Sequence, residues 1–309
     1  MRALLTIAHA AALLVLPFLT IGVVTRTKAR WAGRKGPPLF QALSDCRRLL
    51  LKRPVYSVVT TEIFRLGPLV LLASTLVSAA MMPVLGAFAP VSFPYDFVAV
   101  AYLWGLGRIA LVLSALDTGS SFEGMGASRE ATYAALVEPA LFLALGTLAA
   151  ATGHGTLADL VGLGARGPAQ AVITLACAAA LFVVLQVETS RGPVDDPTTH
   201  LELTMIHEVM VLDHSGPELA AIQYASALKT TLCAALVASI LNPLRAPDGL
   251  VLAAAVNLGL TLLVAVLVGC VESLVARLRL RAVPSYVSVA TVSALVALLV
   301  TAWWQGSAR

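Results

Sequence analysis

Six acidic residues and three histidines lie between Gln186 and Ser215, a stretch of only thirty residues. The whole chain of 309 residues contains 17 acidic residues and 5 histidines. Carboxylates and imidazoles are the side chains that most often transfer protons or bind metal ions in proteins. The stretch is therefore where we look first for proton or metal chemistry.

Glu202 has the most unusual position in this stretch. Thr198 or Thr199 can cap a helix after Pro197. On that helix, Glu202 is centred on an apolar face made by Leu201, Leu203, Met205, Ile206, Val209, Met210 and Leu212. The opposite face carries His200, Thr204, His207 and Glu208. Burial penalises a charged carboxylate, so Glu202 is a candidate proton carrier, and a capping contact with a backbone N–H is an equally open alternative.

The histidines do not form a recognised metal motif. The run HEVMV has Val211 where a zinc-binding HExxH helix would have its second histidine. The four cysteines show no CxxC spacing, which argues against a zinc or iron–sulfur site and against a disulfide framework. We therefore predict that this chain binds no metal or cluster.

Four charged residues, of which Glu188 belongs to the stretch above, lie in or at the ends of apolar runs. Arg108 is in the middle of one run, Glu138 near the start of another, and Glu188 and Glu272 at the ends of two more. Ionisable groups inside a membrane are costly and by default functional candidates. We expect the buried Arg108 to contact Asp117, Glu138 or Glu188, whereas Glu272 also fits a helix-end acid at the level of the lipid headgroups.

These residues must be positioned by helices, because the chain is 59% hydrophobic and only 12% charged. Its apolar runs reach the roughly 20 residues that a bilayer span requires. The sequence predicts an all-α polytopic membrane protein with a single membrane domain over residues 1–309. The eight predicted spans cover roughly 3–25, 66–88, 94–116, 131–152, 168–189, 225–241, 249–271 and 284–304.

Lysine and arginine collect in alternate loops, which predicts the orientation. The positive-inside rule places the loops near 26–65, 117–130, 190–224 and 272–283 in the cytoplasm and both termini outside. The basic residues thus report topology, and no feature points to nucleic acid. Leucines and bases over residues 39–52 fit an amphipathic helix on the inner membrane face. Because all long polar loops share one side, we expect a partner to dock there.

Two glycine-rich runs are weaker indications of a binding site. The run GLGARG, residues 162–167, follows no strand and is expected to be a turn. The run GSSFEGMG, residues 119–126, could form an anion-binding nest, but glycines that permit close packing are the preferred interpretation.

Several motifs resemble those of the respiratory complex I subunit 1 family. They are GRKGPPLFQALSDCRRLLLK in the first loop, GSSFEGMGASRE, RGPVDDPTTHLELTMIHE and ESLVARLRLRAVP. They look closest to the membrane anchor subunit of formate hydrogenlyase and related group 4 membrane-bound [NiFe] hydrogenases. Glu123 departs from the family's usual second glycine, and Arg277 from its usual lysine.

The resemblance implies a membrane-anchoring, energy-coupling subunit of a multi-subunit oxidoreductase. Its implied partners are a hydrogenase-like large subunit, an iron–sulfur small subunit and antiporter-like membrane subunits in a bacterial or archaeal cytoplasmic membrane. The [NiFe] centre and the iron–sulfur clusters would be in those partners. The predicted proton path or coupling residues are Arg108, Asp117, Glu138, Glu188, Arg191, Asp195, Glu202, Glu208 and Glu272. The predicted docking residues are Gln41, Asp45, Glu123, Arg129, His200 and His207.

Three alternatives are open. The chain could be a quinone-site subunit of a complex I-like NADH dehydrogenase, which a long cavity from the lipid to the cytoplasmic face would favour. A purely architectural anchor would tolerate loss of the predicted path. A self-sufficient transporter would need internal repeats, and none is visible.

Overall fold

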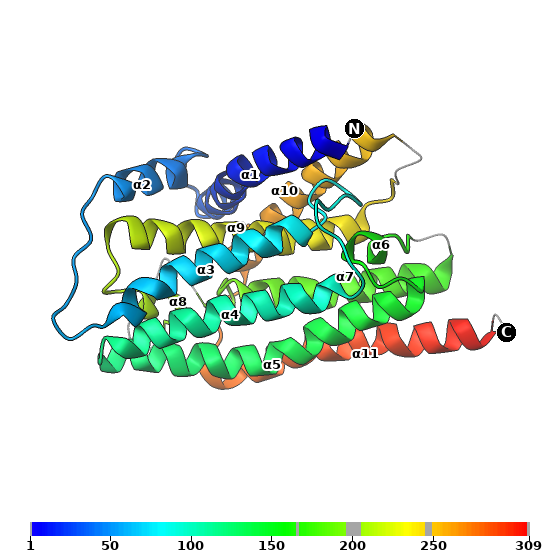
Figure 1. Ribbon diagram of the computed structural model, residues 1–309. Helices are drawn as coiled ribbons and strands as arrows, with labels where there is room; N and C mark the ends of the chain where they lie inside the picture. The colour runs from blue at the N-terminus through cyan, green and yellow to red at the C-terminus, as the bar shows by residue number, and fades with distance from the viewer. Residues whose placement is uncertain (1, 165–166, 196–204, 245–248, 308–309) are drawn as a thin grey trace.

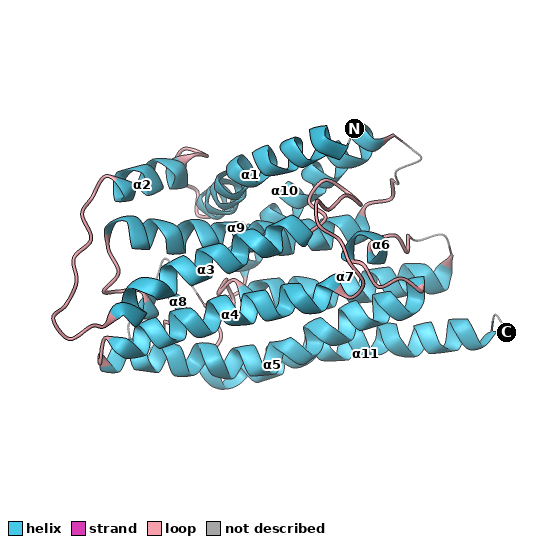
Figure 2. Cartoon of the chain, viewed as in Figure 1, coloured by secondary structure: helices cyan, strands magenta, loops and turns pink. Residues whose placement is uncertain are grey.

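The computed structural model describes residues 2–164, 167–195, 205–244 and 249–307. Within these ranges every regular element is a helix and no strand occurs (Figure 2). The predicted all-α fold is confirmed.

The described residues form eleven α-helices, of which eight are long. The long helices are α1 (Arg2–Trp31), α3 (Glu62–Met81), α4 (Asp96–Asp117), α5 (Ser121–Thr152), α7 (Pro168–Glu188), α9 (Gly216–Leu241), α10 (Leu250–Leu274) and α11 (Val283–Ser307). The short helices are α2 (Gln41–Leu50), α6 (Leu157–Leu160) and α8 (His207–Met210). Eight helices are long and apolar enough to cross a membrane, which is the predicted number.

Two spans begin earlier than predicted. Helix α5 begins at Ser121 rather than near residue 131, and α9 begins at Gly216 rather than near residue 225. Much of the predicted loop 117–130 and the end of the predicted loop 190–224 are therefore helical. Hydropathy detects only the apolar part of a helix, whereas backbone hydrogen bonding continues through polar residues until a cap or proline ends it. Pro217 in the first turn of α9 marks such a start.

Helix α9 lies at the centre of the bundle (Figure 1). It packs against α1, α3, α7 and α10, while α11 packs against α7 and α5, and α3 lies along α4. Small side chains allow these close approaches, as in other membrane bundles. The buried alanines of α9 are Ala220, Ala225, Ala227, Ala234, Ala235 and Ala238.

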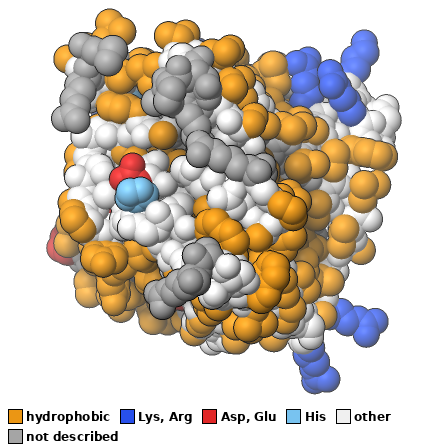
Figure 3. Space-filling model, turned by 90° about the vertical axis from the view of Figure 1, so that its right-hand side faces the viewer, with side chains coloured by type: hydrophobic (Ala, Val, Ile, Leu, Met, Phe, Trp, Pro, Cys, Tyr) orange, Lys and Arg blue, Asp and Glu red, His pale blue; other side chains and the backbone are white. Residues whose placement is uncertain are grey.

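The two ends of the bundle differ in structure. Helices α2 and α8 and the connection over residues 51–61 lie at one end, which we call the loop end (Figure 1). Both termini and α6 lie at the opposite end, as an even number of crossings requires. Figure 3 views that opposite end, which is mostly apolar, with lysine and arginine side chains only toward one margin.

The amphipathic helix predicted over residues 39–52 is present as α2, and Cys46 on it is buried. Leu43 and Leu50 on the same helix are exposed. These exposed leucines give α2 an apolar face that no other described element covers.

The helix predicted to begin at Thr198 or Thr199 is only partly described. Glu202 and His200 lie outside the described residues. Met205 and Ile206 are not helical, so this prediction was wrong for residues 205–206, and among the described residues of the segment only the single turn α8 is helical. The reason is a distant acceptor, since Asp195 Oδ2 accepts hydrogen bonds from the backbone N–H groups of Ile206 and His207, both at 3.1 Å.

The predicted apolar face is nevertheless largely buried. Met205, Ile206, Val209 and Met210 are each at most 2% exposed, whereas Leu212 is half-exposed. Gly126 of α5 makes this packing possible, because a Cβ there would lie 2.4 Å from Val209 Cγ1. The packing interpretation of the 119–126 run is confirmed at Gly126.

Candidate functional site

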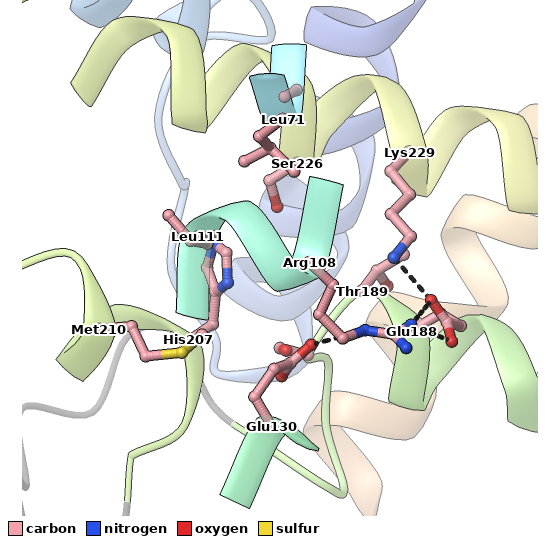
Figure 4. A pocket seen from close by; sticks show the side chains of 12 residues that line it. Leu71, Arg108, Leu111, Glu130, Glu188, Thr189, His207, Met210, Ser226 and Lys229 are labelled. Carbon is pink, nitrogen blue, oxygen red and sulfur yellow. Dashed lines mark hydrogen bonds and ion pairs between the residues drawn. The ribbon is translucent and has the colours of Figure 1, made fainter. Parts of the chain in front are cut away.

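A cluster of five charged side chains lies inside the bundle, centred on Arg108 of α4 (Figure 4). The Arg108 guanidinium contacts both carboxylate oxygens of Glu188, at 2.5 and 2.6 Å. It also donates to Glu138 at 2.8 Å. The predicted pairing of Arg108 is therefore confirmed for Glu138 and Glu188.

Two members of the cluster were not predicted. Lys229 Nζ of α9 lies 2.6 Å from Glu188 Oε2, and Glu130 Oε1 of α5 lies 3.4 Å from Arg108 Nε. Glu130 falls in the predicted loop 117–130 because α5 was predicted too short, and Lys229 lies only four residues inside the predicted span 225–241. A lysine thirteen residues inside an apolar helix would have been an intramembrane candidate once the start of α9 was known.

The cluster holds its charges away from water. The side chain of Glu188 is 1% exposed and that of Arg108 9%, whereas Glu138 is 46% exposed. Removing ions from water costs several kcal/mol per ion, which only close pairing and hydrogen bonding can offset. Arg108 Nη2 donates to both carboxylate oxygens of Glu188, while Nη1 and Nε face Glu138 and Glu130. Lys229 also lies 5.4 Å from the centre of the Trp104 ring. The cluster thus brings three acidic and two basic side chains together.

A small polar cavity of about 40 Å³ adjoins the cluster. Arg108, Glu130, Glu188 and Lys229 line it, together with Thr189 and Ser190 after α7 and His207 of α8 (Figure 4). A cavity of this size and polarity has room for water. Water there would extend the hydrogen-bonded path from Glu188 towards His207.

A second cavity of about 460 Å³ continues the polar path to the loop end. Thr189, Ser190 and His207 line both cavities. Asp45, Arg191 and Glu208 line only the second, which we call the loop-end cavity. The fold thus brings several of the predicted residues, from four different segments, along one route.

Glu272 at the end of α10 has a buried side chain that contacts two basic residues. Its side chain is 2% exposed and lies 3.0 Å from Lys28 Nζ and 3.8 Å from Arg191 Nη1. Arg191 therefore connects Glu272 with the loop-end cavity. This geometry disfavours the simple helix-end interpretation of Glu272.

Asp195 joins three segments near α8. Its Oδ1 accepts from Arg277 at 2.8 Å, and its Oδ2 binds the start of α8 as described above. Arg129 of α5 donates to the Met205 carbonyl at 2.8 Å and so holds the same segment from the other side. Asp195 and Arg129 thus fix the position of His207.

Two predicted residues have different surroundings from those expected. Asp117 accepts from the backbone N–H and the hydroxyl of Thr61, at 2.6 and 2.9 Å, and does not belong to the Arg108 cluster. Glu123 is only 1% exposed and accepts from the Asp213 N–H at 3.2 Å, so its prediction as a docking residue was wrong. The cause is that α5 begins at Ser121, which turns Glu123 inward against residues 211–214.

The other predicted docking residues that the structure describes lie at the loop end, and His200 lies outside the described residues. Gln41 donates to Asp45 at 2.9 Å on α2, and His207 is half-buried between the two cavities. Their role in docking stays a prediction. Within the described part of the chain, no group of three or more His, Cys, Asp or Glu side chains could hold a metal ion.

His214 connects the loop end to the bundle and is sensitive to pH. Its ring stacks on Phe64 with centroids 4.0 Å apart, and Nε2 lies 3.1 Å from Ser114 Oγ. Burial lowers the pKa of His214 from 6.5 to about 4. Glu218 lies 3.6 Å from Nδ1 and would favour the protonated ring. The His214 side chain is fully shielded from water, however, and the effect of this burial on the pKa is the larger one.

We expect His214 to make the protein less stable in mild acid. Below pH 6.5 the histidine binds a proton in the unfolded protein while it stays neutral in the folded protein. The contribution of His214 to the free energy of unfolding is therefore complete above pH 6.5 and is lost as the pH falls towards 4. The loss reaches roughly 3 kcal/mol. Unfolding of wild type and His214→Gln should be compared between about pH 7.5 and about pH 4.5. Parallel pH dependence in the two proteins would contradict this expectation.

The fold and the site together define a polytopic all-α membrane protein with a charge cluster buried among its spans and connected to one end. The NADH dehydrogenase family model matches residues 3–302, and the chain belongs to this family, that of complex I subunit 1.

Full-length relatives support this assignment. Hydrogenase-4 component C of Escherichia coli (strain K12) is 33% identical over 282 residues, covering 88% of this chain and 87% of the relative. Formate hydrogenlyase subunit 4 of the same organism is 28% identical over 294 residues, covering 92% and 94%. A chain in the solved structure of the membrane-bound sulfane sulfur reductase, an archaeal respiratory membrane complex, has a TM-score of 0.77 and 20% identity, covering 96% of this chain and 98% of that one. At that identity the likeness supports the fold.

Proposed function

We propose that this protein is the membrane-anchoring and energy-coupling subunit of a hydrogenase-type complex. It would link electron transfer in a peripheral arm, docked at the loop end, to proton or sodium movement in neighbouring membrane subunits. Full-length similarity to membrane components of hydrogenase-4 and formate hydrogenlyase supports this class of complex.

The observation that carries the coupling role is the pair of cavities that lead from Arg108 to the loop end and share Thr189, Ser190 and His207 in their linings. Glu188 lies at its inner end and Glu208 at its outer end, with His207 between the two cavities. Buried charges that are costly to maintain are usually functional. A merely architectural anchor would have no need for this route.

The proposal also covers the partner subunits and the membrane in which the chain would lie. Its partners would be a hydrogenase-like large subunit, an iron–sulfur small subunit and antiporter-like subunits, and those partners would hold the [NiFe] centre and the clusters. The membrane would be the cytoplasmic membrane, with the loop end inside and both termini outside, as the positive-inside rule indicates.

The test is coupled ion movement in inverted membrane vesicles. Glu138→Gln removes one carboxylate that contacts Arg108, and its side chain is half-exposed, so the fold should tolerate the change. We expect electron transfer to continue while ion movement falls roughly tenfold, which corresponds to about 1.4 kcal/mol. The measurement follows both rates and the co-purifying subunits.

Glu62→Gln is the matched control, because Glu62 is 74% exposed and pairs with Arg65 far from the route. The control should leave both rates unchanged. If Glu138→Gln keeps wild-type ion movement with the complex intact, the purely architectural anchor is the better description.

The second candidate is a quinone-site subunit, and one observation favours it. An apolar cavity of about 730 Å³ lies between α1, α2, α3 and α9, and it shares Phe18 and Cys46 with the loop-end cavity. A lipid-soluble ring could thus approach Glu208 from the membrane. Quinone reductase activity that is lost in Phe18→Trp, with the complex intact, would favour this function.

A further inference from the structure

A separate basic cavity of about 690 Å³ lies where α1 and α10 end at the loop end. Three bases line it: Lys28 in the last turn of α1, Arg34 just beyond that helix and Arg191 after α7. Gln, Asp and Glu side chains are absent from its described lining. The proposed coupling route uses Arg191 but gives no role to this cavity.

The cavity carries an excess of positive charge. Glu272 is the carboxylate that contacts two of the bases, at 3.0 Å from Lys28 and 3.8 Å from Arg191. Glu272 lies nearer to Lys28 than to Arg191, and Arg34 and Arg191 add two further positive charges to the lining, with Arg34 exposed. The bases also outweigh the partial negative charge at the C-terminal ends of α1 and α10. The cavity is therefore suited to an anion.

The surroundings indicate what kind of anion. Helices α1 and α10 both qualify as membrane spans and end together here, so the cavity lies at the level where headgroups meet the protein. Trp31 and Leu274, which also line it, are 56% and 63% exposed. Tryptophan is typical of the membrane–water interface, and exposed leucine suits an acyl chain.

We propose that this α1–α10 cavity binds the phosphate group of an anionic phospholipid. Arg34 and Arg191 contact the phosphate oxygens, Trp31 lies along the glycerol region, and the acyl chains extend over Leu274. Arg191 connects the bound headgroup with Glu272 and the loop-end cavity.

The test uses the full-length protein, purified with its associated subunits and placed in lipid nanodiscs. Native mass spectrometry measures how much phosphatidylglycerol is retained against phosphatidylcholine. The Arg34→Gln protein should retain roughly fivefold less phosphatidylglycerol, the effect of one basic residue near an anionic lipid. Lys35→Gln is the matched control, since Lys35 is the exposed neighbour that does not line the cavity.

Adding millimolar inorganic phosphate distinguishes a phospholipid headgroup from free phosphate as the ligand of the cavity. Retention of the lipid in its presence supports the proposal. Displacement by phosphate, with the same dependence on Arg34, would overturn the lipid assignment in favour of a soluble phosphate. Equal lipid retention by the Arg34→Gln and Lys35→Gln proteins would overturn the site itself.

Discussion

Replacing Arg108 by Met is expected to destabilise the bundle by roughly 3–5 kcal/mol, the usual cost of removing one partner from a buried ion pair. The substitution keeps most of the side-chain volume but removes the contacts with Glu130, Glu138 and Glu188. Lys229 would then be the remaining base within the cluster, and it contacts only Glu188 among the three acids. The uncompensated acids must protonate or draw in water, and either response disrupts the polar route.

The free energy of unfolding in mixed detergent micelles measures this effect. Arg108→Lys should show an intermediate loss, because a lysine keeps the charge but cannot face Glu130, Glu138 and Glu188 with three separate nitrogens. Arg48→Met is the matched control: Arg48 is 71% exposed beside Asp45, and such pairs contribute roughly 0–1 kcal/mol. A loss for Arg108→Met no greater than that for Arg48→Met would show that the cluster does not stabilise the bundle.

Replacing Asp195 by Ala is expected to release the segment that carries His207. The substitution removes the acceptor for two backbone N–H groups at the start of α8 and the partner of Arg277. Arg277 is 19% exposed and can partly regain water, so we expect a local loss of roughly 2–3 kcal/mol rather than the full cost of a buried pair. Because the bundle core is unchanged, global unfolding should change less than this segment does.

Hydrogen exchange of the Ile206 and His207 amides tests this expectation directly. Their exchange should accelerate roughly a hundredfold, and the peripheral subunits should co-purify poorly because the loop end no longer has one conformation. Asp213→Ala is the matched control, because Asp213 is exposed in the same segment. Unchanged exchange at both amides would contradict the structural role of Asp195.

The sequence predicted the class and the span number because composition and run length report directly on a bilayer. It also predicted that Arg108 contacts Asp117, Glu138 or Glu188, since an arginine inside an apolar helix requires an acid, and the two glutamates are contacts in the structure. Its errors came from helix starts: with α5 and α9 predicted too short, Glu130 was assigned to a loop, Lys229 was left near the start of its predicted span, and Glu123 was assigned to a surface that faces a partner. Hydropathy cannot locate a helix start that lies among polar residues.

The amino-acid sequence is therefore sufficient to predict an all-α membrane bundle with costly charges inside it. Which of these charges meet depends on the tertiary structure. Arg108, Glu130, Glu188 and Lys229 come from four different helices, and their distances depend on how those helices pack rather than on any local pattern. The same holds for Asp195, whose carboxylate binds the backbone N–H groups of Ile206 and His207, more than ten residues further along the chain.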